Sequence, residues 1–361
     1  MILEKKLFKF FLKILIFLLL SLILTVITLK SLYSSYDYFD FQKLKNKNLI
    51  STRALSRSSA QDIKMAYIEG RNKFEIGIFG NHIIQYHSKD VLDEKKDFFN
   101  FWYANISLTE VHHFLIYLDK INKLPDQILV GITAANNDNG ASIIRYQGEL
   151  PLKYISWNKI YKDFFQNRTE FFSFIYQYFS FSTLFKNIDY MNLYQILNQT
   201  FSNKTIHNSD IEDRLISYEY CKKNQRKLER DCALALKYDG SLASEFTYNR
   251  RLVKNGDTLK REVGLKPSDR YVLAYQINEI NKFLKRKGKK ITFYIPPVYE
   301  DNRKTIAREI FDLSLNNLDL TSVDLIDHRF LRNRKDFFVH FDHSNEKYFK
   351  FLMREVDKNN K

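Results

Sequence analysis

Residues 74–82 read FEIGIFGNH, and residues 127–133 read QILVGIT. Each stretch is a short run of mostly apolar residues that ends at turn-forming residues, which is the pattern of a buried strand. Two later runs have the same form, ITFYI at 291–295 and VDLI at 323–326. The four runs together predict four buried strands, and the first two carry the most distinctive residues at their ends.

Helical patterns lie between and after these strands. Residues 108–118 (LTEVHHFLIYL) have helical apolar spacing, and a second helix is expected from Asp269 to about Lys285, with Ser268 as its N-cap. Further helices are expected at 303–313 and 344–356. Alternating strands and helices predict an α/β fold, a three-layer sandwich with a mainly parallel sheet. Ligands of such sheets bind beyond the carboxyl ends of the strands.

The N-terminus predicts a membrane anchor. Residues 14–29 carry no charge, and extension to residue 10 gives a run broken only by Lys13. At ~1.5 Å per residue this run is about as long as a bilayer core is thick. More lysines precede it than follow it, which places the N-terminus in the cytoplasm and the rest outside. A cleaved signal peptide is the alternative, although no A-x-A-like site follows.

Composition excludes several classes of protein. The chain has 361 residues, of which 45% are hydrophobic, with 10 glycines and 5 prolines, so it is neither disordered nor collagen-like. The net charge of +15 comes largely from scattered lysines without an Arg-rich tract, and we expect no nucleic-acid partner. Two cysteines exclude a disulfide framework and a multi-cysteine metal site. Cys221 and Cys232 can form a disulfide outside the cytoplasm, but not from one straight helix, where they would be ~16 Å apart.

The expected organisation has four parts. Residues 1–9 are a cytoplasmic tail, 10–29 a transmembrane signal anchor, 30–70 a juxtamembrane stalk, and 71–361 the α/β domain. Aromatic helical stretches such as FFSFIYQYFSFSTLF at 171–185 indicate a helical insertion at about 151–265. We expect this stretch to be helix core, with contact to the bilayer as the alternative. Two adjacent histidines, His112 and His113, are expected on a helix surface.

Polar and titratable residues follow the expected strands, where a ligand site belongs. They are Gly80, Asn81 and His82 after the first strand, Asn136, Asn137 and Asp138 after the second, Asp327 and His328 after the fourth, and His340, Asp342 and His343 before the last helix.

The order of these blocks resembles the SGNH (GDSL-like) hydrolase superfamily, in particular its membrane-anchored, extracytoplasmic branches in bacterial envelopes. FGNH at 79–82 is similar to the family's Gly-Asp/Asn-Ser block, ITAANNDNG at 132–140 to the block with the oxyanion Asn, and HSNEKY at 343–348 to the block with the catalytic His. The resemblance covers about 70–150 and 265–361. It implies an SGNH/flavodoxin-like fold and esterase or acyltransferase chemistry.

The resemblance also assigns roles to residues of this chain. His343 takes the place of the base, and Asn137 that of the oxyanion donor, with Asn136 as the alternate. Substrate contacts are expected from Asn81, Asn105, Asp138 and His340. The chain departs from the family at the nucleophile, where His82 replaces Ser, and three residues before His343, where His340 replaces Asp. Asp342 or Asp327 is then expected to orient His343.

Because imidazole has no hydroxyl with which to attack an acyl carbon as serine does, the resemblance implies a catalytically degenerate hydrolase. His82, His343 and Asp342 would stand at its catalytic positions, and its ligands would be acyl or O-acetyl groups of envelope glycans or lipids. A non-catalytic envelope binding or scaffold protein is one alternative. A metal-dependent hydrolase using His82, His340 and His343, a cluster that suits zinc, is another. The favoured interpretation needs no metal or cofactor.

Overall fold

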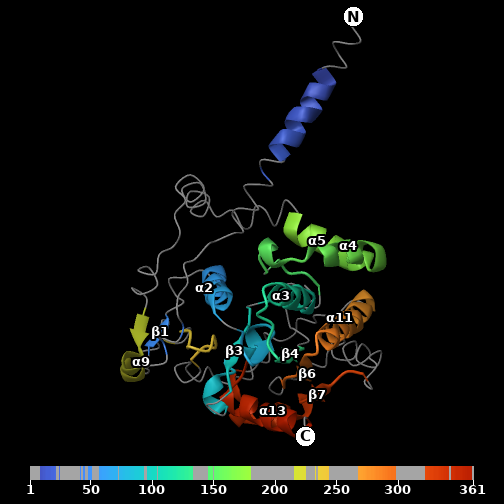
Figure 1. Cartoon of the computed structure of the whole chain (residues 1–361). Helices are drawn as coiled ribbons and strands as arrows, with labels where there is room; N and C mark the ends of the chain where they lie inside the picture. The colour runs from blue at the N-terminus through green and yellow to red at the C-terminus, as the bar shows by residue number, and fades with distance from the viewer. Residues whose placement is uncertain are drawn as a thin grey trace, which may run out of the picture.

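Figure 1 shows a computed structural model of the chain. The structure describes residues 9–21, 24, 41, 44, 48–50, 57–71, 73–92, 96–103, 105–132, 145–148, 150–179, 215–224, 232, 235–243, 267–297, 322–340 and 343–359.

A five-stranded parallel sheet forms the centre of the molecule, in the order β3-β2-β4-β6-β7. Its strands are β2 (Ile76–Phe79), β3 (Phe98–Asn100), β4 (Gln127–Gly131), β6 (Lys290–Ile295) and β7 (Leu325–Asp327). In chain order within the sheet this is 2-1-3-4-5, a common doubly wound order. The direction of the winding reverses between β2 and β4, so the ligand crevice of this topology lies at the carboxyl ends of these two strands.

The four strands expected from apolar runs are present, each shifted or shortened by at most a few residues. Buried strands of parallel sheets are apolar on both faces, and every residue of β2 is buried. The sequence did not predict β3, whose three residues FFN are too few to show a period. The backbone N–H of Asn100 donates to the carbonyl oxygen of Asp239 at 2.8 Å, so a later segment bonds to β3 at the sheet edge.

Helices lie on both faces of the sheet. In Figure 1 the strands lie between α3 (Leu108–Lys120) and α11 (Pro267–Arg286) on one side and α13 (Glu346–Asn359) on the other. The prediction of an α/β fold with a mainly parallel sheet is therefore confirmed. The last helix begins two residues later than expected because Asn345 is its cap: its Oδ1 accepts from the N–H groups of Lys347 at 3.0 Å and Tyr348 at 3.2 Å.

Residues assigned to the stalk also contribute to the body. Helix α2 (Arg57–Gly70) packs into the main core through residues such as Tyr67 and Ile68, and Phe41 is buried there too. Strand β1 (Asn48–Ile50) pairs antiparallel with β5 (Leu215–Ser217).

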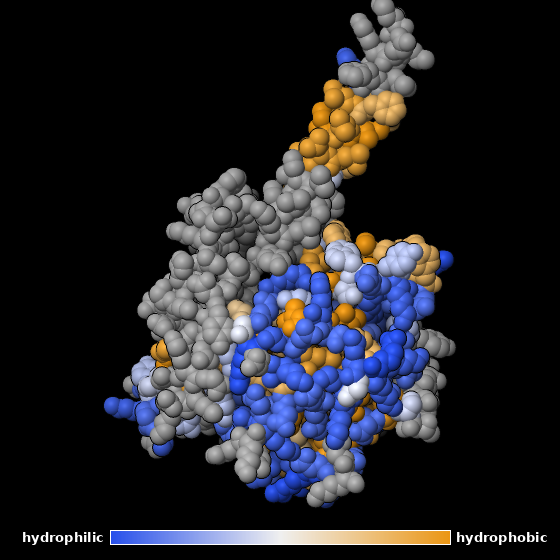
Figure 2. Space-filling view, in the orientation of Figure 1, coloured by the Kyte–Doolittle hydropathy of each residue, from blue (hydrophilic) through white to orange (hydrophobic). Residues whose placement is uncertain are grey.

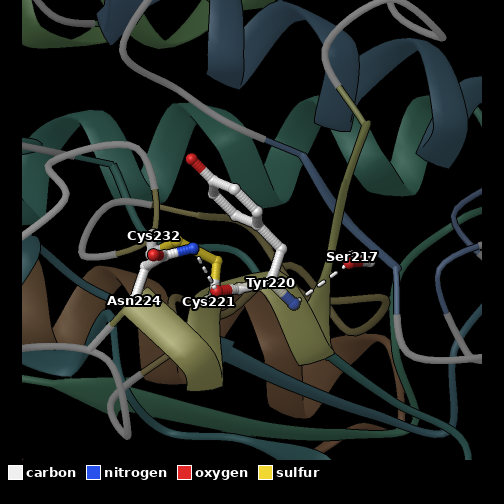
Figure 3. The surroundings of a disulfide bond; sticks show 5 residues. All are labelled: Ser217, Tyr220, Cys221, Asn224 and Cys232. Atoms are coloured by element: carbon white, nitrogen blue, oxygen red, sulfur yellow. Dashed lines mark hydrogen bonds between the residues drawn. A yellow bond between two sulfur atoms is a disulfide. The ribbon is translucent and has the colours of Figure 1, made fainter.

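Cys221, in helix α9 (Tyr218–Asn224), forms a disulfide with Cys232 (Figure 3). The two cysteines therefore do not lie on one straight helix. On such a helix they would have been too far apart to bond. The two cysteines belong to a small apolar cluster, whose other buried members are Leu49, Ala235 and Ala243.

The region expected to be a helical insertion contains α4 (Trp157–Gln166) and α5 (Arg168–Phe179), together with β5 and α9. The expected helix at 303–313 lies outside the described residues.

Residues 9–21 of the N-terminal segment are helical. Their apolar side chains are exposed, and the helix stands apart from the body in Figures 1 and 2. Among the described residues, no helix has both the length and the apolar character needed to cross a bilayer.

Candidate functional site

The loop after β2 is held tightly against the end of β4. Ile84 packs between Gly80 and Gly131. A Cβ atom added to Gly80 would lie 3.2 Å from Cδ1 of Ile84, and a Cβ atom added to Gly131 would lie 3.1 Å from Cγ2 of Ile84. Larger residues at either position would push the loop away from the sheet. On its other side, the carbonyl oxygen of Gly80 accepts from the backbone N–H of Tyr103 at 3.1 Å.

Asn81 starts the short 3₁₀ turn η2 (His82–Ile84) that carries His82. It is buried, and its Oδ1 accepts from the N–H of Ile83 at 3.1 Å, which is a side-chain cap. The turn therefore presents His82, which is half-buried, at the carboxyl end of β2.

His343 arrives from the opposite end of the chain on a small hairpin. Strand β8 (Phe338–His340) pairs antiparallel with β9 (His343–Ser344), and His340 stands opposite His343 in the register. The hairpin leads directly into α13, whose position against the sheet fixes where His343 lies.

The structure brings His82 and His343 together. Their ring centroids are 5.1 Å apart, and the ring of Tyr86 lies edge-on to His343 at 5.7 Å. Two imidazoles and a phenol beyond the carboxyl ends of the strands can donate and accept hydrogen bonds. The site thus has acid–base groups, but its two histidines supply no hydroxyl nucleophile.

A buried serine–histidine contact lies next to this pair and joins the same two segments. Nε2 of His87 is 2.8 Å from Oγ of Ser344, and Nδ1 is 3.4 Å from the hydroxyl of Tyr294. Both His87 and Ser344 are fully buried. Burial lowers the pKa of His87 to about 3, so the ring is neutral at physiological pH. We interpret the contact as structural, because no substrate can reach it.

Asn100, the last residue of β3, fixes the other side of the loop. Its Nδ2 donates to the carbonyl oxygens of Ile84 at 2.8 Å and His87 at 2.9 Å, and its Oδ1 accepts from the N–H of Trp102 at 3.0 Å. All the groups involved are buried. One amide therefore ties the segment that bears His82, Tyr86 and His87 to the edge of the sheet.

Other residues expected in the site have different positions. Asn105 is half-buried in a turn two residues beyond Tyr103, whose N–H contacts Gly80. Asn136, Asn137, Asp138 and Asp342 lie outside the described residues, as does the side chain of His340. Both carboxylate oxygens of Asp327 accept from Arg329, one of them at 2.6 Å from Nη2, and its suggested role in orienting His343 stays a prediction.

Two neighbouring residues serve the fold. Ser88 is fully buried and donates to Asp239 Oδ2 at 2.8 Å, so its hydroxyl is part of the packed interior. His328 is buried at the end of β7, with Nε2 at 2.6 Å from Glu355 and Nδ1 at 3.1 Å from the hydroxyl of Tyr348. Among the side chains that the structure describes, no group of three or more histidine, cysteine or acidic residues could hold a metal ion.

The expectation that His112 and His113 form a surface pair is wrong, because both are buried in α3. Nδ1 of His112 lies 3.3 Å from Gln276 Oε1, and Nδ1 of His113 accepts from the N–H of Ser156 at 3.0 Å. Burial lowers the pKa of each ring well below its ordinary value. The partners lie far away in the sequence, so the local pattern did not reveal them.

Sequence reasoning also missed His87, Ser344 and Asn100. Nothing in their spacing distinguishes them from ordinary loop residues, because their importance comes from contacts across the fold.

No family model matches the chain, and neither does any curated protein.

Proposed function

We propose that this chain is a membrane-anchored, extracytoplasmic protein of SGNH-hydrolase type that has lost the serine nucleophile. In this proposal the crevice around His82 and His343 binds acyl or O-acetyl groups of envelope glycans or lipids. Residues 10–29 anchor the chain in the bilayer, with the N-terminus in the cytoplasm. The proposal takes the finer fold assignment, SGNH/flavodoxin-like, from the order of the sequence blocks and of the strands.

The observation that carries the proposal is the 5.1 Å separation of the His82 and His343 rings. The first residue stands at the nucleophile position of the resemblance and the second at the base position. Serine hydrolysis needs these two positions close to each other at the carboxyl edge of the sheet. In a sheet of this strand order, ligands bind at the carboxyl ends of β2 and β4, where the winding reverses.

Two further observations support the proposed location. The disulfide between Cys221 and Cys232 is typical of proteins that fold in an oxidising compartment. The uncharged run at 14–29, preceded by several lysines, is typical of a signal anchor with the domain outside.

The test restores the missing hydroxyl. The full chain is purified in detergent, and hydrolysis of 4-nitrophenyl acetate is compared for wild type, His82→Ser, His343→Ala and the double variant. We expect no His343-dependent turnover in the wild type. We expect turnover in His82→Ser, and its loss in the double variant, because His343 would accept the proton of the introduced hydroxyl.

Two outcomes count against the proposal in different ways. If His82→Ser folds with an unchanged unfolding midpoint and turns over no faster than wild type, the hydrolase-like site is absent. If the wild type itself shows turnover that His343→Ala removes, the site is hydrolase-like but the chain is an active enzyme.

A further inference from the structure

An exposed aromatic face covers α4 and α5. On α4 it consists of positions 157, 161, 164 and 165, and on α5 of positions 172, 175 and 176, spacings that place residues on one side of a helix. The side chains are exposed by 40–69%, and they are Trp157, Tyr161, Phe164, Phe165, Phe172, Ile175 and Tyr176. So many large apolar side chains in contiguous positions indicate a binding surface.

The opposite sides of the two helices are fixed to the body. Ile160 and Phe174 are buried in the main core. The hydroxyl of Tyr275 in α11 donates to Asp163 at 3.3 Å, and the hydroxyl of Thr109 in α3 donates to Glu170 at 2.6 Å. The aromatic face is therefore a stable feature of the folded domain.

The exposed charges that α4 and α5 themselves carry are positive. Asp163 and Glu170 are the only acidic residues from 156 to 179, and both side chains are buried. Arg168 is exposed on the same side of α5 as Phe172, and Lys162 is partly exposed, although it also pairs with Glu279. The face thus offers aromatic rings and cations to its partner, and no acidic group.

This chemistry suits the headgroup region of a bilayer. Trp and Tyr concentrate at membrane–water interfaces, where the ring lies in an apolar layer and its polar atom contacts water. A basic rim adds attraction to anionic lipids.

The face also lies on the appropriate side of the molecule. In Figure 1, α4 and α5 are at the end of the body nearest the N-terminal helix, and Figure 2 shows orange atoms at both places.

We propose that the aromatic face of α4 and α5 docks on the surface of the bilayer, in the headgroup layer of anionic lipids. The inference rests on the proposed anchorage, which keeps the domain beside the membrane. Docking would add a second attachment that holds the domain in one orientation on the lipid surface.

A spin label at one position of the face tests this directly. Cys221 and Cys232 are bonded to each other, so an introduced cysteine is the only reactive thiol. Phe165→Cys places the label on the face. Phe330→Cys is the matched control, because Phe330 is a phenylalanine of similar exposure, 70% against 62% for Phe165, and lies after β7, elsewhere on the body. Both full-length variants are reconstituted into vesicles of three parts phosphatidylcholine to one part phosphatidylglycerol.

The readout is the collision rate of the label with oxygen, which dissolves in lipid, and with a nickel chelate, which stays in water. We expect the ratio of the two rates at position 165 to rise several-fold above that at position 330. Equal, water-like ratios at both positions in protein that floats with the vesicles overturn the docking proposal and leave the anchor intact. Failure to float overturns both membrane attachments.

If the aromatic face instead binds a second copy of the chain, the spin label will give a third result. Both collision rates at position 165 would be low, and dipolar broadening would disappear on dilution with unlabelled protein, which also overturns lipid docking. Ester hydrolysis by His82→Ser, reconstituted separately into the same vesicles, reports on the proposed function.

Discussion

His87 lies flat against Phe349, with ring centroids 4.9 Å apart and an interplanar angle of 8°. It joins the loop of His82 to the hairpin of His343 through Ser344. Its buried ring is neutral in the folded protein, with a pKa of about 3, whereas in the unfolded chain it titrates near 6.5. The unfolded state therefore binds more protons between these values, and the stabilising contribution of the neutral ring is lost as pH falls below 6.5.

From this linkage we predict that His87→Gln reduces the acid sensitivity of the protein. Lowering the pH from 7 to 5 should cost the wild type about 2 kcal/mol more than the variant, from the shift at this one residue. Urea unfolding at the two pH values measures the difference. Parallel losses in wild type and variant would show that His87 does not titrate on unfolding.

Two glycines with left-handed backbone form a second test at the residue scale. Gly240 has φ +78°, and a Cβ there would lie 2.7 Å from Phe99 Cζ and 2.8 Å from the carbonyl oxygen of Asn100. Gly288 has φ +65°, and a Cβ would meet nothing within 4 Å.

Gly288→Ala should cost about 1 kcal/mol, which is backbone strain alone. Gly240→Ala should cost about 3 kcal/mol or more, because steric overlap adds to that strain. Unfolding midpoints measure both. Equal costs would mean that the segment around Gly240 does not pack on β3 as described.

At the scale of elements, the contact between α3 and α5 contains a buried acid. Glu170 is held by the hydroxyl of Thr109, and burial raises its pKa to about 7 against the lowering effect of that hydrogen bond. The folded state holds a proton that the unfolded chain releases near 4.5, so the stability contributed by Glu170 is complete below 4.5 and declines as pH rises through 7.

Glu170→Gln should therefore stabilise the protein at pH 8 relative to wild type by up to about 3 kcal/mol. The amide oxygen can still accept from Thr109. At pH 4.5 the two proteins should be nearly equal. Thermal unfolding at the two pH values is the measurement, and a stability difference that does not change with pH would contradict a protonated Glu170.

How far the sequence predicts each element depends on where its contacts lie. The strands at Ile76–Phe79 and Lys290–Ile295 each contain a run of mostly apolar residues, so their pattern shows in isolation. Strand β3 is a strand because β2 lies beside it, and no local pattern reveals that pairing. The same limit applies to the site: the turns that bear His82 and His343 are visible in the sequence, whereas the supports from Asn100, His87 and Ser344 exist only in the folded chain.

At the scale of the whole molecule, the disulfide tests the proposed topology. The full chain, expressed in bacteria and trapped with acid, should react with a thiol reagent at Cys221 and Cys232 only after reduction. A chain lacking residues 1–29 should stay in the cytoplasm and react without reduction. A mass-tagging gel shift distinguishes the two states, and free thiols in the trapped full-length protein would contradict an extracytoplasmic domain.

The proposed function requires His82 and His343 to occupy the nucleophile and base positions of a hydrolase-like site. The most direct measurement is the intact mass of His82→Ser after exposure to a fluorophosphonate, in which the introduced hydroxyl oxygen bonds to phosphorus and fluoride leaves. The account predicts one adduct on His82→Ser, none on the wild type and none on the variant that also carries His343→Ala. An unmodified His82→Ser, or an adduct that forms without His343, would contradict it.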